Sequence, residues 1–257
     1  MGGESQNPIV NTGGPFPADN AAVDYIYCPD PCEQSCNLEA CGLDCLPRDP
    51  CSYPENGGCP PGYSGMGREG CCTPSSPIVV DVNGNGFNLT DAEHGVTFDI
   101  SGNGTSRHFA WTSPGSDDAW LVLDRNNNGT IDNGTELFGN FTPQPSPPAG
   151  AIRNGFLALA EFDKTTNGGN NDGFITPQDS IFGLLRLWQD LNHNGISEPG
   201  ELFGLSAIGI DSVELNYQES KRTDDHGNQF RFRTKLKDTQ GHHVARWAWD
   251  VFLTSTP

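Results

Sequence analysis

The sequence predicts an α+β protein in which short β-strands and hairpins surround an EF-hand-like helix–loop–helix with several calcium loops, preceded by a disulfide-rich segment. Three observations lead to this prediction. Short apolar runs typical of strands are separated by loops rich in Asp, Asn and Gly. One such loop, residues 190–201, has the ligand spacing of an EF-hand. All nine cysteines fall within residues 28–72.

Composition divides the chain into three parts. Residues 1–27 are rich in Gly, Pro, Asn and Ala, which predicts a flexible or extended arm. Residues 28–73 carry the cysteines without a His, which favours disulfides, and a zinc site of four cysteines is the alternative. Because nine is odd, one thiol is free or pairs with another chain. Residues 74–257 are predicted to form the calcium-binding α+β domain.

The chain is strongly acidic, with 33 Asp and Glu against 14 Lys and Arg and a formal charge of −19. Nucleic acid is therefore excluded as an expected partner, because phosphate binding needs a basic surface. Much of the acid stands beside Asn and Gly in short loops, which favours calcium ions as the partner. No apolar run approaches the roughly 18 residues of a membrane helix, so no membrane span is expected.

Two features indicate the cellular compartment, and they disagree. The first residues lack the basic and apolar parts of a signal peptide. The cysteines nevertheless favour an oxidising compartment. A removed leader or an uncleaved export route reconciles the two, and we expect a secreted or cell-surface protein.

The secondary structure of residues 74–257 is predicted from apolar periodicity. Seven stretches predict strands: 77–82, 96–100, 108–112, 119–123, 212–217, 229–236 and 243–253. The strands predicted at 212–217 and 229–236 flank a polar turn at 223–228, which predicts a hairpin. Residues 155–162 predict a helix. Residues 180–189 have apolar residues at helical spacing, and residues 198–205 can begin another helix, so these two flank the loop 190–201 as in an EF-hand.

The loop 190–201 offers an oxygen at each EF-hand ligand position. Side chains at positions 1, 3, 5, 9 and 12 point inward, and position 7 contributes its backbone carbonyl. The predicted ligands are Asp190, Asn192, Asn194, Ile196, Glu198 and Glu201. Position 4 is His193, where a side chain is expected to face solvent.

Three further loops match the calcium pattern less completely. The loop 124–136 predicts the ligands Asp124, Asn126, Asn128, Thr130, Asp132 and Glu136, the last at position 13 rather than 12. The loop 163–179 predicts Asp163, Asp172, Phe174 and Asp179, provided that five residues loop out after position 1. The group Asp81, Asn83 and Asn85 makes half a site, or equally a hairpin turn.

The histidines have no Ser or Cys neighbours that would form a nucleophile–base arrangement, and no glycine-rich loop cradles a phosphate. We therefore expect that the protein is not an enzyme. The interpretation is a calcium-binding, extracellular structural or interaction module, with a surface or fibre subunit as a close variant. Other copies of the chain are the expected partners, through the arm or the odd cysteine.

Four stretches resemble a known family, the calcium-dependent self-processing module of bacterial RTX proteins and its relatives in secreted bacterial proteins. They are PIVVDVNGNG (77–86), LDRNNNGTIDNGTELFG (123–139), GFLALAEFD (155–163) and LRLWQDLNHNGISEPGEL (185–202). The likeness runs in order from about residue 77 to residue 217. It implies a bacterial, exported protein with an EF-hand-like calcium domain.

The resemblance also implies an alternative function, calcium-dependent self-processing. In that family an Asp-Pro bond before the first strand is cut, because the Asp carboxylate attacks its own carbonyl to form an anhydride. The matching proline is Pro77, but Ser76 precedes it, and a hydroxyl cannot form that anhydride. The Asp30–Pro31 and Asp49–Pro50 bonds lie among the cysteines, away from that strand.

Overall fold

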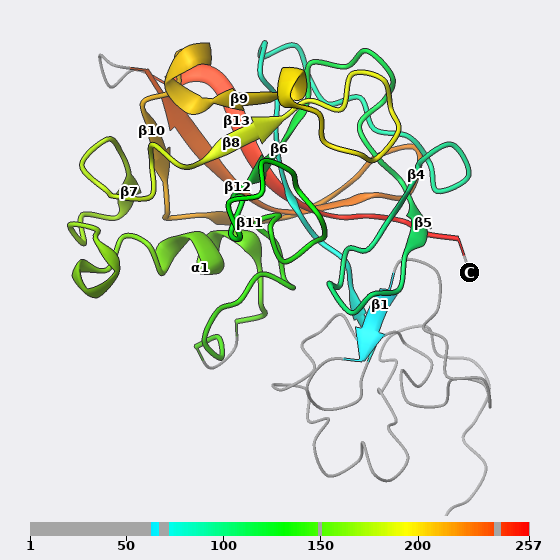
Figure 1. Ribbon diagram of the computed structural model, residues 1–257, viewed down its shortest axis with the longest axis horizontal. Helices are drawn as coiled ribbons and strands as arrows, with labels where there is room; N and C mark the ends of the chain where they lie inside the picture. The colour runs from blue at the N-terminus through cyan, green and yellow to red at the C-terminus, as the bar shows by residue number, and fades with distance from the viewer. Residues whose placement is uncertain (1–62, 67–71, 149–150, 239–242, 257) are drawn as a thin grey trace, which may run out of the picture.

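The computed structural model describes residues 63–66, 72–148, 151–238 and 243–256 (Figure 1). The arm predicted at 1–27 and the cysteines at 28–71 lie outside the described residues, so the disulfide prediction stays a prediction. Inside the cysteine-rich segment, β1 (Tyr63–Met66) and β2 (Cys72–Pro74) form a short antiparallel hairpin. No helix of the described residues is long and apolar enough to cross a membrane.

A nine-stranded antiparallel sheet makes up most of the structure and curls into a half-barrel (Figure 1). Eight strands follow one another in the order β7, β10, β12, β13, β3, β6, β8, β9, and β11 pairs with β12 outside this path. Their bounds are β3 (Ile78–Val80), β6 (Ala119–Val122), β7 (Phe174–Ile175), β8 (Arg186–Trp188), β9 (Leu202–Gly204), β10 (Ser212–Glu214), β11 (Gln218–Thr223), β12 (Gln229–Lys237) and β13 (His243–Phe252). Outside this sheet, β4 (Val96–Phe98) pairs with β5 (Arg107–Phe109).

Apolar side chains are buried on both faces of the sheet, because successive residues of a strand point to opposite sides. In β3, Ile78 and Val80 belong to one buried cluster and Val79 to the other. The helix α1 (Gly155–Ala160) contributes to the first cluster. The β4–β5 hairpin contributes to the second, together with the buried indoles of three tryptophans, Trp111, Trp120 and Trp188. Burial on both faces fixes the sheet between two cores.

The predicted fold class is wrong, since the protein is mostly β with one short α-helix among its described residues and no EF-hand helix–loop–helix. The predicted helix at 180–189 is a turn followed by β8, and the predicted helix at 198–205 is a 3₁₀ turn (Pro199–Glu201) followed by β9. The loop 190–201 therefore joins two antiparallel strands.

The spacing of apolar residues at 180–189 was misleading because both faces of β8 are buried. Leu187 packs in one cluster and the adjacent Trp188 in the other, which only a strand allows. Leu184, which would complete a helical stripe, is 56% exposed. A short run buried on both sides cannot be distinguished from a helix by periodicity alone.

The other element predictions agree with the structure in position. The seven predicted strands correspond to β3, β4, β5, β6, β10, β12 and β13, and the predicted helix corresponds to α1. The two strands of the predicted hairpin do pair, as β10 and β12, but the prediction missed β11, which lies between them and directly precedes the turn at 224–228. Asn154 begins α1, and its side chain accepts a hydrogen bond from the backbone N–H of Leu157.

Candidate cation-binding loops

The loop 190–201 is organised by its first residue. The Asp190 carboxylate is buried and accepts the backbone N–H of Asn194 at 3.0 Å and that of Gly195 at 2.8 Å. Gly195 has φ +70°, a conformation that L side chains rarely adopt, and a Cβ there would lie 3.0 Å from a side-chain carbon of Val96. The loop therefore turns sharply around one carboxylate, as the predicted spacing requires.

The side chains predicted as ligands at positions 3, 5 and 9 converge in the structure. The amide groups of Asn192 and Asn194 donate to the same Glu198 oxygen, Oε1, at 3.3 and 3.0 Å. The amide of Asn194 is the main cause that lowers the pKa of Glu198. The second oxygen, Oε2, is buried and has no hydrogen-bond partner in the described residues. An oxygen in that state suits a cation, which would also draw the amide oxygens inward.

Glu201 closes the loop from position 12. Its Oε1 accepts the backbone N–H of Leu191 at 2.9 Å, and its Oε2 faces the backbone N–H of Glu198 and the indole N–H of Trp188 at 3.3 and 3.2 Å. Burial is the main cause that raises the pKa of Glu201, and the adjacent Glu198 carboxylate adds to it. The loop thus places two acids close together in a partly dry position.

The loop 124–136 repeats the same arrangement. Asp124 accepts the backbone N–H groups of Asn128 and Gly129 at 3.2 and 2.8 Å. The amides of Asn126 and Asn128 both donate to Asp132 Oδ2 at 2.8 Å, and the Asn126 amide is the main cause that lowers the pKa of Asp132.

Two further ligands predicted in that loop also lie within it. The Thr130 hydroxyl donates to Asp132 Oδ1 at 3.1 Å. The buried Glu136 accepts the backbone N–H of Arg125 at 2.9 Å and that of Asp132 at 2.7 Å. Glu136 therefore contacts both the start of the loop and position 9, although it stands one residue later than the usual closing acid.

The loop 163–179 accommodates its insertion as predicted, with a 3₁₀ turn at Thr165–Asn167. Asp163 accepts the backbone N–H groups of Asp172 and Gly173 at 3.1 and 2.9 Å, the roles of positions 5 and 6. Asp179 closes the loop by accepting from the backbone N–H of Thr176 at 2.7 Å. Phe174, predicted to contribute its carbonyl at position 7, begins β7.

Asn170 also belongs to this loop, although its sequence position did not predict it as a ligand. Its side-chain oxygen accepts the backbone N–H of Asp172 at 3.1 Å, as that of Asn126 accepts the backbone N–H of Asn128 at 3.0 Å. Asn170 is therefore the counterpart of Asn126 at position 3. Its distance of two residues from Asp172 is the spacing of positions 3 and 5, but the inserted residues after Asp163 obscured this spacing.

Two of the loops are joined directly through residues that were not predicted as part of any site. The backbone N–H of Ile131 donates to the Ser197 hydroxyl at 2.6 Å, and both residues are buried. Each stands at position 8 of its loop. The loops 124–136 and 190–201 are therefore linked at equivalent positions.

The expectation for His193 is wrong, because its side chain does not simply face solvent. Its Nδ1 lies 2.8 Å from the carbonyl oxygen of Thr112, and its Nε2 lies 2.8 Å from that of His94. The residue adopts φ +56°. The histidine thereby anchors the loop 190–201 to two distant backbone segments that no local pattern identifies.

The half-site at Asp81 also turns around its first carboxylate. Asp81 accepts the backbone N–H groups of Gly84, Asn85 and Gly86 at 2.7, 3.1 and 2.8 Å. The side chain of Asn85 donates to Asp117 at 2.9 Å, and so does the backbone N–H of Asn83 at 2.8 Å. A residue absent from the predicted ligand set therefore takes part in this loop.

The Ser76–Pro77 junction, matched to the cleavage position of the resembled family, is buried and regularly paired. The backbone N–H of Ser76 donates to the Asn140 side chain at 3.0 Å, and the backbone N–H of Asn140 returns to the Ser76 carbonyl at 3.2 Å. A Cβ at Gly139 would meet the Ser76 carbonyl oxygen at 1.6 Å, so the two backbones touch. The peptide N–H and carbonyl of Ser76 are thus both hydrogen-bonded to Asn140.

Two comparisons place the chain among known proteins. The family model of the SPM domain matches residues 78–253. The iron-regulated protein FrpA of Neisseria meningitidis serogroup C is 36% identical over 167 residues. The match covers 64% of this chain and 14% of FrpA, so the chain spans a small part of that relative's length. The identification as an EF-hand-like module is corrected: the family is that of the SPM domain, carried here by a curled sheet.

Proposed function

The chain belongs to the SPM domain family, and from this premise we propose that it is a bacterial, extracellular module whose fold is stabilised by bound calcium. One observation carries the proposal. In three loops, an aspartate accepts the backbone N–H groups of positions 5 and 6 while an acid at the far end ties the loop closed. The relative from Neisseria meningitidis supports the bacterial source.

Calcium suits these loops better than other common cations. The donors are carboxylates, amides and carbonyls, which are the oxygen ligands that calcium takes in sets of six to eight. No loop offers the sulfur or imidazole ligands that zinc prefers, since His193 is engaged by two carbonyl groups. Extracellular calcium modules bind with dissociation constants of about 10⁻⁴ to 10⁻³ M, which fits loops made of neutral amides and few acids.

The role that we propose is structural and not enzymatic. The arm at 1–27 and the cysteine-rich segment at 28–73 serve as attachment or assembly elements, and other copies of the chain are the partners. The strand order of the sheet ends at β7 and at β9, and an extended segment could add a strand at such an edge.

Calorimetric titration tests the proposal directly. We expect calcium to bind the full chain at three or more sites with dissociation constants of about 10⁻⁴ to 10⁻³ M. The double variant Asp124→Asn with Asp190→Asn should lose two of these sites, because position 1 is the residue around which each loop turns. Binding of calcium that is unchanged in this variant would contradict the assignment, and binding of none by the wild type would refute the proposal.

We expect no cleavage at the Ser76–Pro77 bond when the protein is incubated with millimolar calcium at neutral pH. Ser76 lacks a carboxylate, and its carbonyl and N–H are both hydrogen-bonded to Asn140. Intact-mass spectrometry measures the outcome, with the variant Ser76→Asp as the comparison that restores the missing group. A wild-type fragment that begins at Pro77, and forms only with calcium, would show that the protein processes itself.

A further inference from the structure

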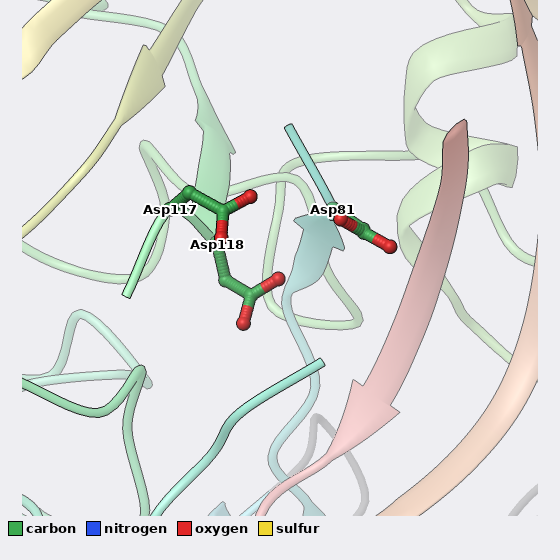
Figure 2. A group of neighbouring side chains, drawn as sticks. All are labelled: Asp81, Asp117 and Asp118. Atoms are coloured by element: carbon green, nitrogen blue, oxygen red, sulfur yellow. The ribbon is translucent and has the colours of Figure 1, made fainter. Parts of the chain in front are cut away.

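Three carboxylates from two separate segments lie together where the neighbouring strands β3 and β6 end and begin. Asp81 directly follows β3, and Asp117 and Asp118 directly precede β6. The two strands are antiparallel neighbours, with Val80 opposite Ala119, so their register brings the acids together. One oxygen from each acid lies within 4.8 Å of the other two. Figure 2 shows the Asp81 side chain beside those of Asp117 and Asp118.

Backbone and hydroxyl donors hold the three carboxylates in place. Asp118 Oδ2 accepts from the backbone N–H of Asn88 and from the Ser116 hydroxyl, both at 2.7 Å. Asp81 and Asp117 are held by the turn at 83–86, as described above. The acids are therefore positioned before any ligand arrives.

An unpartnered oxygen points to a ligand. Asp118 is 1% exposed, and its Oδ1 is buried without a hydrogen-bond partner in the described residues. Leaving a buried carboxylate oxygen unpaired is costly, because the group gives up its hydration and receives nothing in exchange. Since Oδ2 already holds both donors, Oδ1 is the oxygen left for another contact.

In the part of the chain that the structure describes, no nitrogen of a Lys, Arg or His side chain lies within 4.0 Å of these three carboxylates. The ion pairs His94–Asp91 and Lys164–Glu161 involve other acids. Burial is the main cause that raises the pKa of Asp118 to about 6, and the charges of Asp117 and Asp81 add to it. Three acids without a counter-charge repel one another, so a cation would remove an unfavourable interaction as well as add a favourable one.

We propose that Asp81, Asp117 and Asp118 bind one calcium ion that ties the end of β3 to the start of β6. The spacing fits this ion, because oxygens that contact calcium at about 2.3–2.6 Å can be up to about 5 Å apart across it. This site rests on the proposed function, since it is one more place where the protein binds calcium. Its ligands are Asp81, Asp117 and Asp118, in place of the set Asp81, Asn83 and Asn85 that the sequence predicted. Asn83 and Asn85 support it by donating to Asp117.

The position of the site gives the ion a second consequence. The side-chain amide of Gln189 donates to the backbone carbonyl of Asp117 at 2.7 Å. Gln189 directly precedes Asp190, the first residue of the loop 190–201. An ion that fixes Asp117 therefore also fixes the entry of that loop.

Calcium titration of the full chain and of Asp118→Asn and Asp117→Asn tests the proposal. We expect each variant to bind one calcium ion fewer than the wild type, or to bind it at least tenfold more weakly. Asp225→Asn, which removes an exposed acid in the turn after β11, is the matched control and should bind as the wild type does. Unchanged binding in both variants would overturn this site while the proposed function stands. Binding of no calcium by the wild type would overturn both.

Thermal melting separates a cation site from a structural role of the acid. In chelator, Asp118→Asn should melt at or above the wild-type temperature, because the amide relieves charge repulsion and keeps an oxygen for Asn88 and Ser116. In calcium it should gain less than the wild type gains. A variant that is destabilised equally in both conditions would show that Asp118 acts only as a hydrogen-bond acceptor.

Discussion

Removing calcium with a chelator is expected to lower the melting temperature of this protein by about 10 °C. At ion concentrations about ten times the dissociation constant, each site adds about 1.4 kcal/mol to the free energy of unfolding. Three loops then add about 4 kcal/mol, against the ~5–15 kcal/mol that typically stabilises a domain. For a domain of this size, each kcal/mol shifts the melting temperature by about 2–4 °C.

The measurement is a thermal melt followed by far-ultraviolet circular dichroism, in millimolar calcium and in chelator. Magnesium at the same concentration is the control for ionic strength, and it should restore little, because it demands shorter and more regular coordination. Identical melting curves with calcium and with chelator would mean that the loops hold no ion that matters to the fold. In that case the hydrogen bonds within each loop would be sufficient to hold its shape without an ion.

The substitution Glu201→Ala should damage the loop 190–201 far more than Asn192→Ala. Glu201 can give a cation two charged oxygens, while Asn192 gives one neutral oxygen that water replaces. The alanine also leaves the part-buried backbone N–H of Leu191 and the buried indole N–H of Trp188 without their acceptor. Each lost buried hydrogen bond costs about 1–3 kcal/mol, so the fold is weakened even without calcium.

Calorimetry and melting of both variants measure these two effects separately. Glu201→Gln is the control, since it keeps an oxygen for Leu191 and removes the charge. Its NH2 group cannot accept the hydrogen bonds that Oε2 receives from Trp188 and Glu198. We therefore expect its calcium affinity to fall by at least tenfold, and its melting temperature in chelator to fall less than that of Glu201→Ala. A larger loss of affinity for Asn192→Ala than for Glu201→Ala would show that Glu201 does not close a cation site.

The sequence identified most strands because their signals are local. In β3 and β6 the runs Ile78–Val80 and Ala119–Val122 are continuous, apolar and bounded by Asp and Asn turns. The segment that contains β8 was misassigned as a helix because both faces of a strand can be apolar when two cores exist. Only the pairing of Leu187 and Trp188 with β6 and β9 distinguishes the two possibilities, and pairing is not a local property.

The same distinction between local and long-range contacts applies to the candidate cation-binding loops. Within each loop, the residue types and their spacing predicted which carboxylate organises the turn, since the backbone closes over a fixed number of residues around Asp124, Asp163 and Asp190. The contacts between loops were not predictable. His193 reaches Thr112, and Ser197 reaches Ile131, over separations in sequence that only the assembled sheet sets.

The central pair of the sheet joins residues that are far apart in the chain. β3 and β13 are antiparallel neighbours, with Val79 opposite Trp249 and Val80 opposite Ala248, and β13 also makes the longest ladder of the sheet with β12. A loop of this length has a high entropic cost of closure, and proteins dominated by such pairings fold slowly, in about milliseconds to seconds. The sheet therefore cannot be completed until both β3 and β13 are present, so a chain that lacks either strand loses the pair that joins the two halves of the sheet.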